Sequence, residues 1–466
     1  MIESITQGAS GLPYGLNEIW SALQGAPARL GLCMQSGRGA LPSALATTDL
    51  ACSSIAAAGL ALSEYAAAGG AAAARVVVDR RLASLWFASS LRPQGWSMAP
   101  AWDPLAGDYE SADGWIRLHT NAPHHRAAVL AVLGLGDRAG REDVARAVAR
   151  QDAEELEAAL VAHGACAARM RSSEAWLAHA QGRAVAAEPL LHYAVGEEGA
   201  AAPCEIARAR PLRAIRVLDL TRIIAGPVAT RFLAGYGADV LRIDPLLWDE
   251  PGTEQEMTLG KRCARLDLKS RAGRETFERL LSRADVLVHG YRSDALEALG
   301  LGAERRRRLR PGLIDVSLDA YGWSGPWRER RGFDSLVQMS SGIAETGMRA
   351  FGRERPTPLP VQALDHACGY VLAAAVLRGL DLRRRAGTGS MWRTSLARMA
   401  QLLLTLPAGA PGAPALAPET PDDVCPGGEA TAWGPARRLV APLTVSASPL
   451  YWERPASALG TDPARW

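Results

Sequence analysis

The sequence predicts an α/β protein with a Rossmann-like parallel sheet and a second, smaller α+β domain. The main signal lies between Arg216 and Asp244, where a short apolar run is followed by a turn, a helical stretch and a second apolar run. Strand, turn, helix and strand within about thirty residues form a βαβ unit, whose two strands are parallel. Ligands of open parallel sheets usually lie at the carboxyl ends of the strands, so the turn after Leu220 is the first candidate binding site.

Each element of this unit has its own signal. We expect strands at Arg216–Leu220 and Asp239–Asp244, because both runs are short and mostly apolar. Between them, Val228 to Tyr236 has helical spacing, and Gly237 suits the end of that helix because glycine adopts the left-handed conformation at little cost. Helical patterns also occur at Gly273–Arg283 and His366–Arg378.

The composition is that of a globular protein. The chain has 466 residues, enough for two or more domains, of which 48% are hydrophobic and 22% charged. A formal net charge of +3 gives no reason to expect nucleic acid or a membrane surface as a partner. The seven cysteines show no CxxC and no metal-ligand spacing, and the segment MIESITQGAS is not a signal peptide. We therefore expect reduced thiols, no metal site and a cytoplasmic location.

The chain divides into two predicted units, residues 1–205 and 206–466. The first unit has a helix at Asp49–Ala68, a strand at Ala74–Val78, a hairpin that turns at Asp113-Gly114, and three helical stretches between His125 and His163. A small-residue segment, 196–211, is predicted to link the two units. Residues 407–435 are rich in Pro, Gly and Ala and are predicted to form a surface loop.

Five segments between Arg216 and Pro326 carry a resemblance to one enzyme family. They are RVLDLTRIIAGP, Lys261-Arg262 with LDLK, ADVLV, LGLG and PGLIDVSLDAYGWSGP. In this order they resemble the family III CoA-transferases, which include formyl-CoA transferase and the carnitine CoA-transferases. The resemblance implies acyl-CoA and carboxylic acid substrates, coenzyme A as co-substrate, no tightly bound cofactor, and an interlocked homodimer.

The order of the segments departs from the family. The stretch YESADGWIRLH, Tyr109 to His119, resembles the start of the family's small domain, which follows the catalytic segment in other members. Here it precedes that segment. Two explanations stay open: a permutation of the chain, or a fused and degraded duplication.

CoA transfer between acids requires a carboxylate nucleophile near backbone N–H groups that can stabilise an oxyanion. The resemblance assigns this role to Asp365, just ahead of a small-residue helix. From the residues alone, the favoured role of Asp365 is an N-cap of the helix that starts at His366, and the match to the family motif reverses this preference. Asp334 matches a position that lines the family's active site, and its alternative is an N-cap for residues 335–339.

Related racemases carry histidine where this chain has Phe333, which cannot transfer a proton, so the sequence favours transferase over racemase. His366 is a poor substitute base, because neighbouring residues on a helix point about 100° apart. A non-enzymatic homologue that binds CoA esters is the remaining alternative.

The resemblance also assigns CoA contacts by position. These are Ile224, Ala225, Leu266, Lys269, Gly290, Tyr291, Arg292 and Arg331. Three positions depart from the family: Gly290 and Leu259 stand where asparagines are usual, and Pro245 where a basic residue sometimes occurs. The run of arginines at 305–308 is expected to be a solvated helix face, with a CoA phosphate contact as the alternative.

Overall fold

The computed structural model describes residues 11–67, 72–199, 206–407 and 414–466. Its centre is a seven-stranded sheet in the order β10-β9-β8-β11-β12-β13-β7. The strands from β10 to β13 are parallel, and β7 pairs antiparallel with β13 at the edge. In chain order they are β7 (His192–Glu198), β8 (Arg216–Leu220), β9 (Asp239–Asp244), β10 (Arg262–Arg265), β11 (Val286–His289), β12 (Ile314–Asp319) and β13 (Thr388–Ser395).

The predicted βαβ unit is confirmed. Strands β8 and β9 have the predicted bounds, and helix α9 (Ala225–Gly235) connects them. Gly237 follows the helix with φ 106°, as its predicted role at the helix end requires. The predicted helix at His366 is longer than its pattern indicates: α16 runs from Ala363 to Ala386 and ends at Gly387, which has φ 73°.

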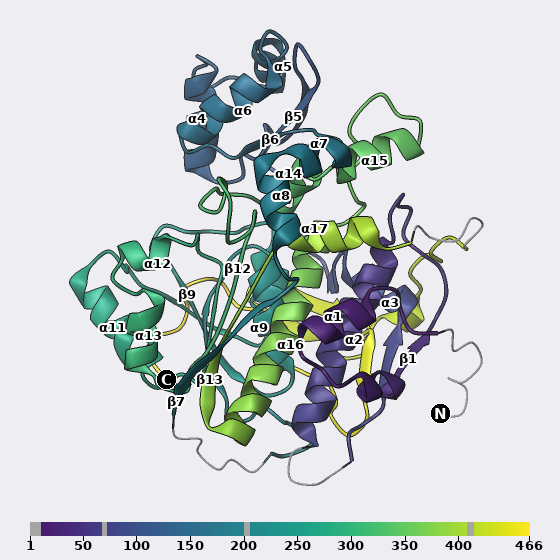
Figure 1. The fold of residues 1–466 in the computed structure, drawn as a ribbon, viewed down its shortest axis with the longest axis vertical. Helices are drawn as coiled ribbons and strands as arrows, with labels where there is room; N and C mark the ends of the chain where they lie inside the picture. Colours follow the sequence, from purple (N-terminus) through teal and green to yellow (C-terminus); the bar gives the residue numbers. More distant parts are fainter. Residues whose placement is uncertain (1–10, 68–71, 200–205, 408–413) are drawn as a thin grey trace.

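A second, three-stranded sheet lies across from the large one. It consists of β1 (Cys33–Ser36), β2 (Val76–Asp79) and β16 (Leu443–Val445). Helix α2 (Thr47–Ala66) covers this sheet and packs against α16, which covers β12 and β13 of the large sheet (Figure 1). Helix α16 is long and apolar enough to cross a bilayer, but its apolar stretch is entirely buried between these layers. Sheet, helix, helix and sheet therefore form one layered core.

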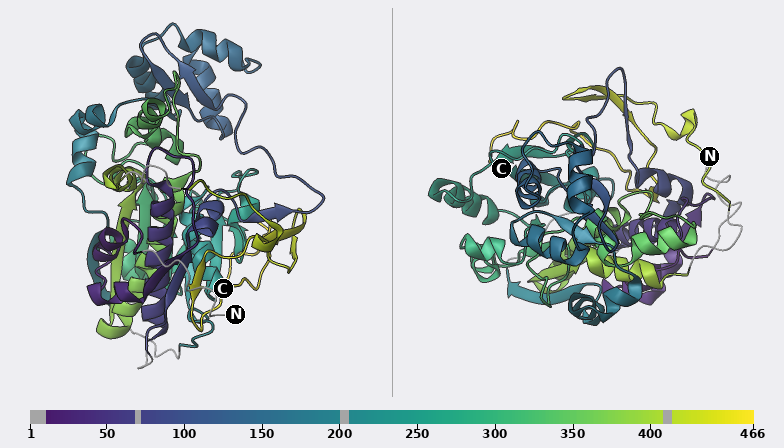
Figure 2. Two further views of the ribbon diagram at one scale, coloured as in Figure 1. Left: turned by 90° about the vertical axis from the view of Figure 1, so that its right-hand side faces the viewer. Right: turned by 90° about the horizontal axis from the view of Figure 1, so that it is seen from above.

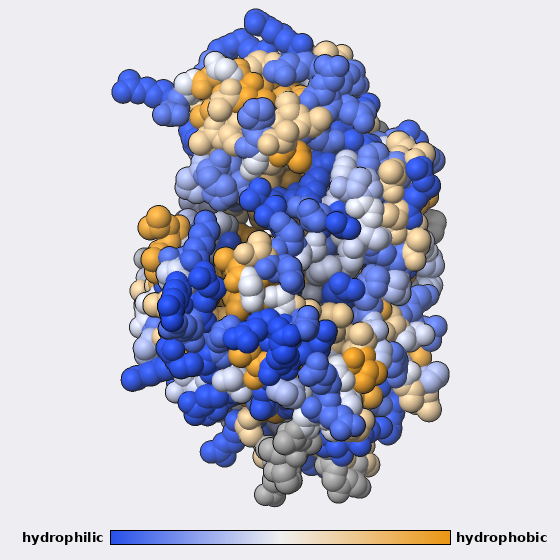
Figure 3. Space-filling model, turned by 60° about the vertical axis from the view of Figure 1, so that its left-hand side comes forward, coloured by the Kyte–Doolittle hydropathy of each residue, from blue (hydrophilic) through white to orange (hydrophobic). Residues whose placement is uncertain are grey.

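The smaller α+β part stands above this core as a separate lobe (Figures 1 and 2). It contains the predicted hairpin, β4 (Gly107–Glu110) and β5 (Trp115–Leu118), to which β6 (Ala167–Arg169) adds. The three predicted helices are α4 (Pro123–Val132), α5 (Arg141–Val148) and α6 (Ala153–Ala162), and they share an apolar core with the hairpin. The surface narrows between this lobe and the body (Figure 3).

Two loop predictions are wrong in part. The segment predicted as a linker begins inside β7, whose residues up to Glu198 pair with β13, while residues 200–205 of it lie outside the described ranges. The predicted surface loop at 407–435 contains β14 (Glu429–Thr431), which pairs with β15 (Gly434–Arg438) and through it with β3 (Leu91–Pro93). The pairings of β7 with β13 and of β15 with β3 join strands that are distant in sequence, so local composition carries no signal for them.

Glu256 in α10 (Glu254–Met257) forms buried ion pairs and hydrogen bonds with separate segments of the chain. Its carboxylate accepts from the Leu91 amide at 2.9 Å and pairs with Arg231 of α9 and with Arg438, whose Nη1 lies 3.1 Å away. Burial opposes ionisation, but the two guanidinium groups lower the pKa of Glu256 to about 2. One carboxylate thus joins the first half of the chain, the βαβ unit and the carboxyl-terminal segment.

The remaining elements are helices and 3-10 turns. They are α1 (Leu16–Ala22), α3 (Arg80–Trp86), α7 (Ser173–Ala178), α8 (Ala180–Ala187), α11 (Arg271–Leu281), α12 (Ala295–Ala298), α13 (Ala303–Leu309), α14 (Asp334–Ser340), α15 (Ile343–Ala350), α17 (Leu396–Thr405), and the 3-10 turns η2 (Pro27–Leu32) and η3 (Pro421–Asp423).

Candidate functional site

Buried charges hold the turn after β8 in one conformation. The Asp219 carboxylate accepts from the Thr221 amide at 2.9 Å and from Lys261 Nζ at 3.1 Å. Ile223 has φ 65°, a left-handed conformation that costs a side chain roughly 1–2 kcal/mol. Its N–H donates to Glu250 Oε1 at 2.9 Å, and the other oxygen of Glu250 lies 2.9 Å from Arg242, both side chains being fully buried. The strain is therefore maintained by the surrounding network, as is common where a backbone is shaped for binding.

Asp365 belongs to a helix that passes close to this turn. It occupies the first turn of α16 and is only 8% exposed. One turn further along α16, a Cβ on Gly369 would lie 2.5 Å from the Ala225 carbonyl oxygen, so the helix passes close to the start of α9. Among the described residues, no side chain or amide bonds to the Asp365 carboxylate. The Asp365 carboxylate is thus buried and has no hydrogen-bond partner in the described part of the chain.

Asp334 is linked to Asp365 through the backbone. Its Oδ2 accepts the Asp365 N–H at 2.9 Å, and its Oδ1 accepts from Gln338 Nε2 at 2.5 Å. The capping alternatives are wrong for both residues: the N-cap of α16 is Gln362, the N-cap of α14 is Phe333, and neither aspartate caps its own helix. Instead Asp334 accepts a hydrogen bond from an amide at the start of α16. The first amides of a helix have no acceptor within the helix itself, so they need one from elsewhere.

The two carboxyl groups resist ionisation. Burial, and then the charge of Asp334, hold the pKa of Asp365 well above its usual range. Burial likewise raises the pKa of Asp334 to about 6. Two carboxylates in one water-poor site repel each other when both are ionised, so the pair titrates as a unit. The positive end of α16 favours the negative charge that the pair does carry.

The small lobe covers this pair. His119, which follows β5, stacks flat on Phe333 with ring centroids 3.7 Å apart, and the Arg171 N–H donates to the Met339 carbonyl at 2.9 Å. Burial, His125 and Arg117 lower the pKa of His119 to about 3, so its ring is neutral. The sequence showed His119 only as part of a hairpin, because nothing local relates it to a residue more than two hundred positions away.

His366 points elsewhere. Its ring stacks on Phe87 of the first half at 5.0 Å, and burial lowers its pKa to about 3. This orientation agrees with the expectation that His366 does not serve as a base for its neighbour Asp365.

Comparison with known proteins identifies the segment that holds these residues. The model of CoA-transferase family III matches residues 212–423. Residues 212–423 belong to CoA-transferase family III. Similar curated proteins include the probable fatty acyl-CoA transferase Rv3272 of Mycobacterium tuberculosis, 33% identical over 207 residues, which cover 40% of this chain and 51% of the relative. The succinyl-CoA:glutarate CoA-transferase of Mus musculus is 32% identical over 195 residues, 39% of this chain and 44% of that protein.

The chain spans about half the length of the curated relatives that it matches. Solved structures include Rv3272, with a TM-score of 0.38 at 33% identity over 41% of this chain and 56% of that chain. A CAIB/BAIF family protein from Brucella suis has a TM-score of 0.37 at 25% identity over 49% of this chain and 65% of that chain.

Within the family III segment, four of the predicted CoA positions lie together. Ile224 and Ala225 form the start of α9 after β8, and Gly290 and Tyr291 follow the neighbouring strand β11. Arg222, which sequence reasoning missed, donates to the Tyr291 hydroxyl at 2.9 Å and lies over the Trp248 ring at 4.6 Å. A basic residue directly after the strand was the available signal.

The other predicted positions are spread around this edge. Leu266 and Lys269 follow β10, which β9 separates from β8, and Lys269 is exposed. Arg292 lies 3.5 Å from Asp294, and Arg331 is exposed just before Phe333. After burial, the charges of Arg331 and Arg222 lower the pKa of His124 in the small lobe, so both guanidinium groups lie within electrostatic range of that lobe.

The departures from the family are accommodated without strain. A Cβ at Gly290 would meet only Leu318, at an ordinary 3.5 Å, and Leu259 is buried in the core. The expectation for the arginines at 305–308 is wrong for one of them: Arg306 is buried, and its Nη2 lies 2.7 Å from Asp315. That ion pair supports His289, which is 3.4 Å from the same carboxyl group and precedes Gly290.

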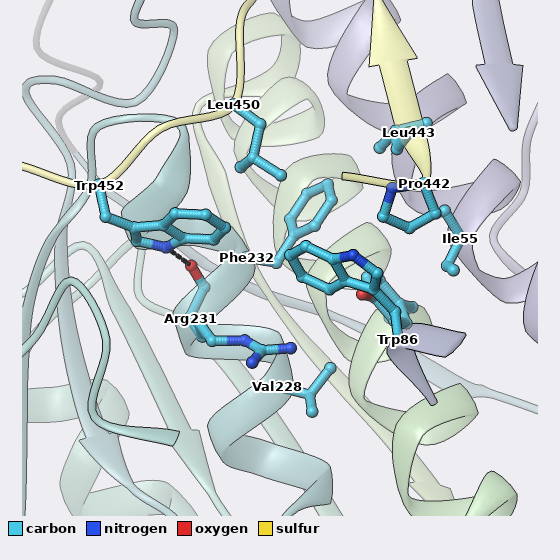
Figure 4. Close-up of a pocket in the computed structure, with 10 residues that line it drawn as sticks. Ile55, Trp86, Val228, Arg231, Phe232, Pro442, Leu443, Leu450 and Trp452 are labelled. Carbon is cyan, nitrogen blue, oxygen red and sulfur yellow. Dashed lines mark hydrogen bonds between the residues drawn. The ribbon is translucent and has the colours of Figure 1, made fainter. Parts of the chain in front are cut away.

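A separate pocket between the halves is structural. Trp86, Phe232 and Trp452 line it, and Trp452 Nε1 donates to the Arg231 carbonyl at 2.9 Å (Figure 4). Its free volume of about 10 Å³ is roughly that of one water molecule, too small for a substrate. Neither Asp334 nor Asp365 lines it.

Proposed function

We propose that this protein transfers coenzyme A from an acyl-CoA to a carboxylic acid, with Asp365 as the nucleophile. The observation that carries the proposal is the state of the Asp365 carboxylate: buried, without a partner among the described residues, and held by its own amide to Asp334. A structural carboxylate at such a site is normally paired, because an unpaired buried charge is unfavourable. A reactive one has to stay free.

Each step of the proposed reaction balances without a cofactor. The Asp365 carboxylate attacks the thioester carbonyl of the donor, the C–S bond breaks, and a mixed anhydride and CoA thiolate result. The thiolate attacks the aspartyl carbonyl, which releases the donor acid and leaves an aspartyl–CoA thioester. The acceptor carboxylate attacks the aspartyl–CoA thioester, expels CoA thiolate and forms a second mixed anhydride. The thiolate then attacks the acceptor carbonyl of that anhydride, which gives the new acyl-CoA and frees Asp365.

The surroundings suit these steps. Asp334 fixes the start of α16 and keeps the pKa of Asp365 high, which makes its carboxylate more basic and more nucleophilic. The amides of Thr221 and Ile223 in the turn after β8 are engaged by Asp219 and Glu250, so a developing oxyanion would use the other amides of this turn. Arg222, Arg331, Lys269 and Arg292 would meet the phosphates of CoA along the strand edge, since guanidinium and ammonium groups are the usual phosphate partners.

The test is the intact mass of the protein after incubation with acyl-CoAs, wild type beside Asp365→Ala. The panel includes succinyl-CoA and a long-chain acyl-CoA, the donors that the names of the relatives suggest. An adduct of acyl or CoA mass in wild type and none in the variant is expected. Binding of CoA without any adduct would overturn the transferase, and exchange of the donor's α-proton with deuterium would then indicate a racemase.

A further inference from the structure

The Asp365 helix has a second copy in the first half of the chain. Residues 48–52, TDLAC, repeat residues 364–368, LDHAC, so that Asp49 corresponds to Asp365 and lies 316 positions earlier. The same interval separates the starts of α2 and α16, at Thr47 and Ala363, and the starts of α3 and α17, at Arg80 and Leu396. Two helix starts and one acid thus share a single offset.

The residues that cap the second helix of each copy also correspond. Asp79 ends β2 and accepts the Leu82 N–H, and Ser395 ends β13 and accepts the Arg398 N–H. Both lie 30 residues after the acid of their own copy. The repeat therefore extends beyond the helix that carries the acid.

The strands beside these helices repeat as well. Strand β1 pairs parallel with β2, with Ser36 opposite Asp79, and β12 pairs parallel with β13, with Asp319 opposite Ser395. On the other side, each central strand has an antiparallel neighbour: β16 beside β2 and β7 beside β13. Each half of the chain supplies the antiparallel neighbour in the other half: β16 comes from the second half and pairs with β2, and β7 comes from the first half and pairs with β13.

The two copies pack on each other. Helices α2 and α16 lie face to face, each on its own sheet (Figure 1). Every residue of α2 is buried, as is α16 from Ala363 to Asp381. The surface that α16 turns away from its sheet is thus already covered by its own repeat.

The copies differ at the acid. Arg80 binds both oxygens of Asp49, at 2.7 and 2.9 Å, and donates through Nε to the Gly39 carbonyl at 3.0 Å. The position that corresponds to Arg80 in the Asp365 unit is Leu396, which is buried and apolar, so Asp365 has no such partner. A guanidinium that binds both oxygens of a carboxylate stabilises its negative charge and so makes it a poorer nucleophile.

We infer that residues 33–87 are a second copy of the Asp365 unit that has become structural and serves as an internal partner. The chain is then a monomer with one reactive carboxylate, in place of the homodimer expected from the resemblance. Only the statement about reactivity rests on the proposed function. The statement about assembly rests on the repeat and its packing alone.

Native mass spectrometry and sedimentation of the full chain test the assembly. A single species of 49.4 kDa is expected at all micromolar concentrations. A stable dimer would overturn the inference whether or not the protein proves to be a transferase.

The role of Asp49 is tested with Arg80→Leu and with the double variant Asp49→Leu/Arg80→Leu. The single change leaves Asp49 buried and unpaired, so we expect its Tm to fall by several degrees, whereas the double variant, an apolar replacement of a buried pair, recovers most of the loss. Equal losses in both variants would contradict a purely structural pair.

The same double variant tests reactivity. Its adduct yield with the best donor should stay within about twofold of wild type, and peptide mapping should place the adduct on Asp365 in both proteins. An adduct on Asp49 in wild type, or loss of adduct in a folded double variant, would show that residues 33–87 still take part in the reaction. If wild type forms no adduct, the proposed function fails, and native mass and Tm still decide the inference.

Discussion

Two buried acidic sites in this protein have opposite surroundings. Glu256 is enclosed by Arg231 and Arg438 and by donors from three segments of the chain, and these lower its pKa to about 2. Asp334 and Asp365 lie at similar depth, no cation in the described part of the chain bonds to either carboxyl group, and burial raises the pKa of both. The negative charge of the first site is balanced by cations, and that of the second is not.

The difference separates what holds the fold from what can react. Breaking a buried pair leaves a charge without compensation, so Glu256 stabilises the native state as long as both cations are present. The aspartate pair destabilises the native state when it is ionised, since each carboxyl group loses its hydration and gains no opposite charge. A protein keeps such an arrangement where chemistry requires it, and removing it should cost function and not stability.

The largest expected effect is on activity. Asp365→Asn keeps the shape of the side chain but removes the nucleophile, so we expect CoA-transfer to fall at least about a thousandfold, close to complete loss. Steady-state transfer between the best donor and acceptor measures it. Glu256→Gln is the matched control, since it is also an acid-to-amide change at a buried site. A similar loss of activity per folded molecule in the control would contradict the contrast between the two sites.

The second effect is on stability and falls on the other site. Glu256→Gln leaves Arg231 and Arg438 buried without a full counter-charge, and we expect the free energy of unfolding to fall by roughly 3 kcal/mol. Urea unfolding at neutral pH measures this change. Asp365→Asn should not lower the free energy of unfolding, and a loss as large as that of Glu256→Gln would show that both acids are structural.

The two sites should also respond to pH with opposite signs. The folded-state pKa of Asp334 is raised, so its ionisation destabilises the fold progressively between about pH 4 and 6. The folded-state pKa of Glu256 is depressed, so its stabilisation is present above about pH 4.5 and is lost as the pH falls toward 2. Asp334→Asn should therefore be more favourable at pH 7 than at pH 4 by about 2 kcal/mol. The free energy of unfolding of Asp334→Asn and Glu256→Gln, relative to wild type, is measured at several pH values. If both differences change with pH in the same direction, the contrast between the two sites is wrong.

Catalysis should reflect the same titration. Because Asp365 must be ionised to attack, and burial and the charge of Asp334 hold its pKa well above the usual range, the acid limb of kcat/KM should lie well above the pH at which an ordinary carboxyl group titrates. Asp334→Asn removes the neighbouring charge that raises the pKa of Asp365, and its acid limb should move to lower pH, at a reduced maximum. An unmoved limb would mean that the two carboxyl groups titrate independently.

The sequence predicted what depends on neighbouring residues. The apolar runs of β8 and β9, the hairpin at Asp113-Gly114 and the left-handed Gly237 all have local causes, and the structure confirms them. The link from Asp334 to the Asp365 amide joins two helices, and the pairing of β7 with β13 joins distant strands. Helical spacing described where each aspartate sits on its own helix, but it could not reveal that one of them binds the other's backbone.

The smallest expected effect concerns the strained turn on the reactive side of the comparison. Ile223→Gly removes the cost of a left-handed side chain, but it also adds freedom to the unfolded chain, so the free energy of unfolding should change by less than about 1 kcal/mol. Gln24→Gly is the matched control, since Gln24 also has a positive φ, 55°, and lies in the turn after α1.

Stability alone would not distinguish these two variants, but CoA binding should. The buried network through Glu250 and Arg242 fixes the Ile223 amide, and a flexible residue there loosens the turn that precedes α9. We expect CoA to bind several-fold more weakly to Ile223→Gly and unchanged to Gln24→Gly, as measured by calorimetry. Equal affinities would mean that the charges around the turn hold its shape without the strained residue, and that the turn belongs with Glu256 among the features that only maintain the fold.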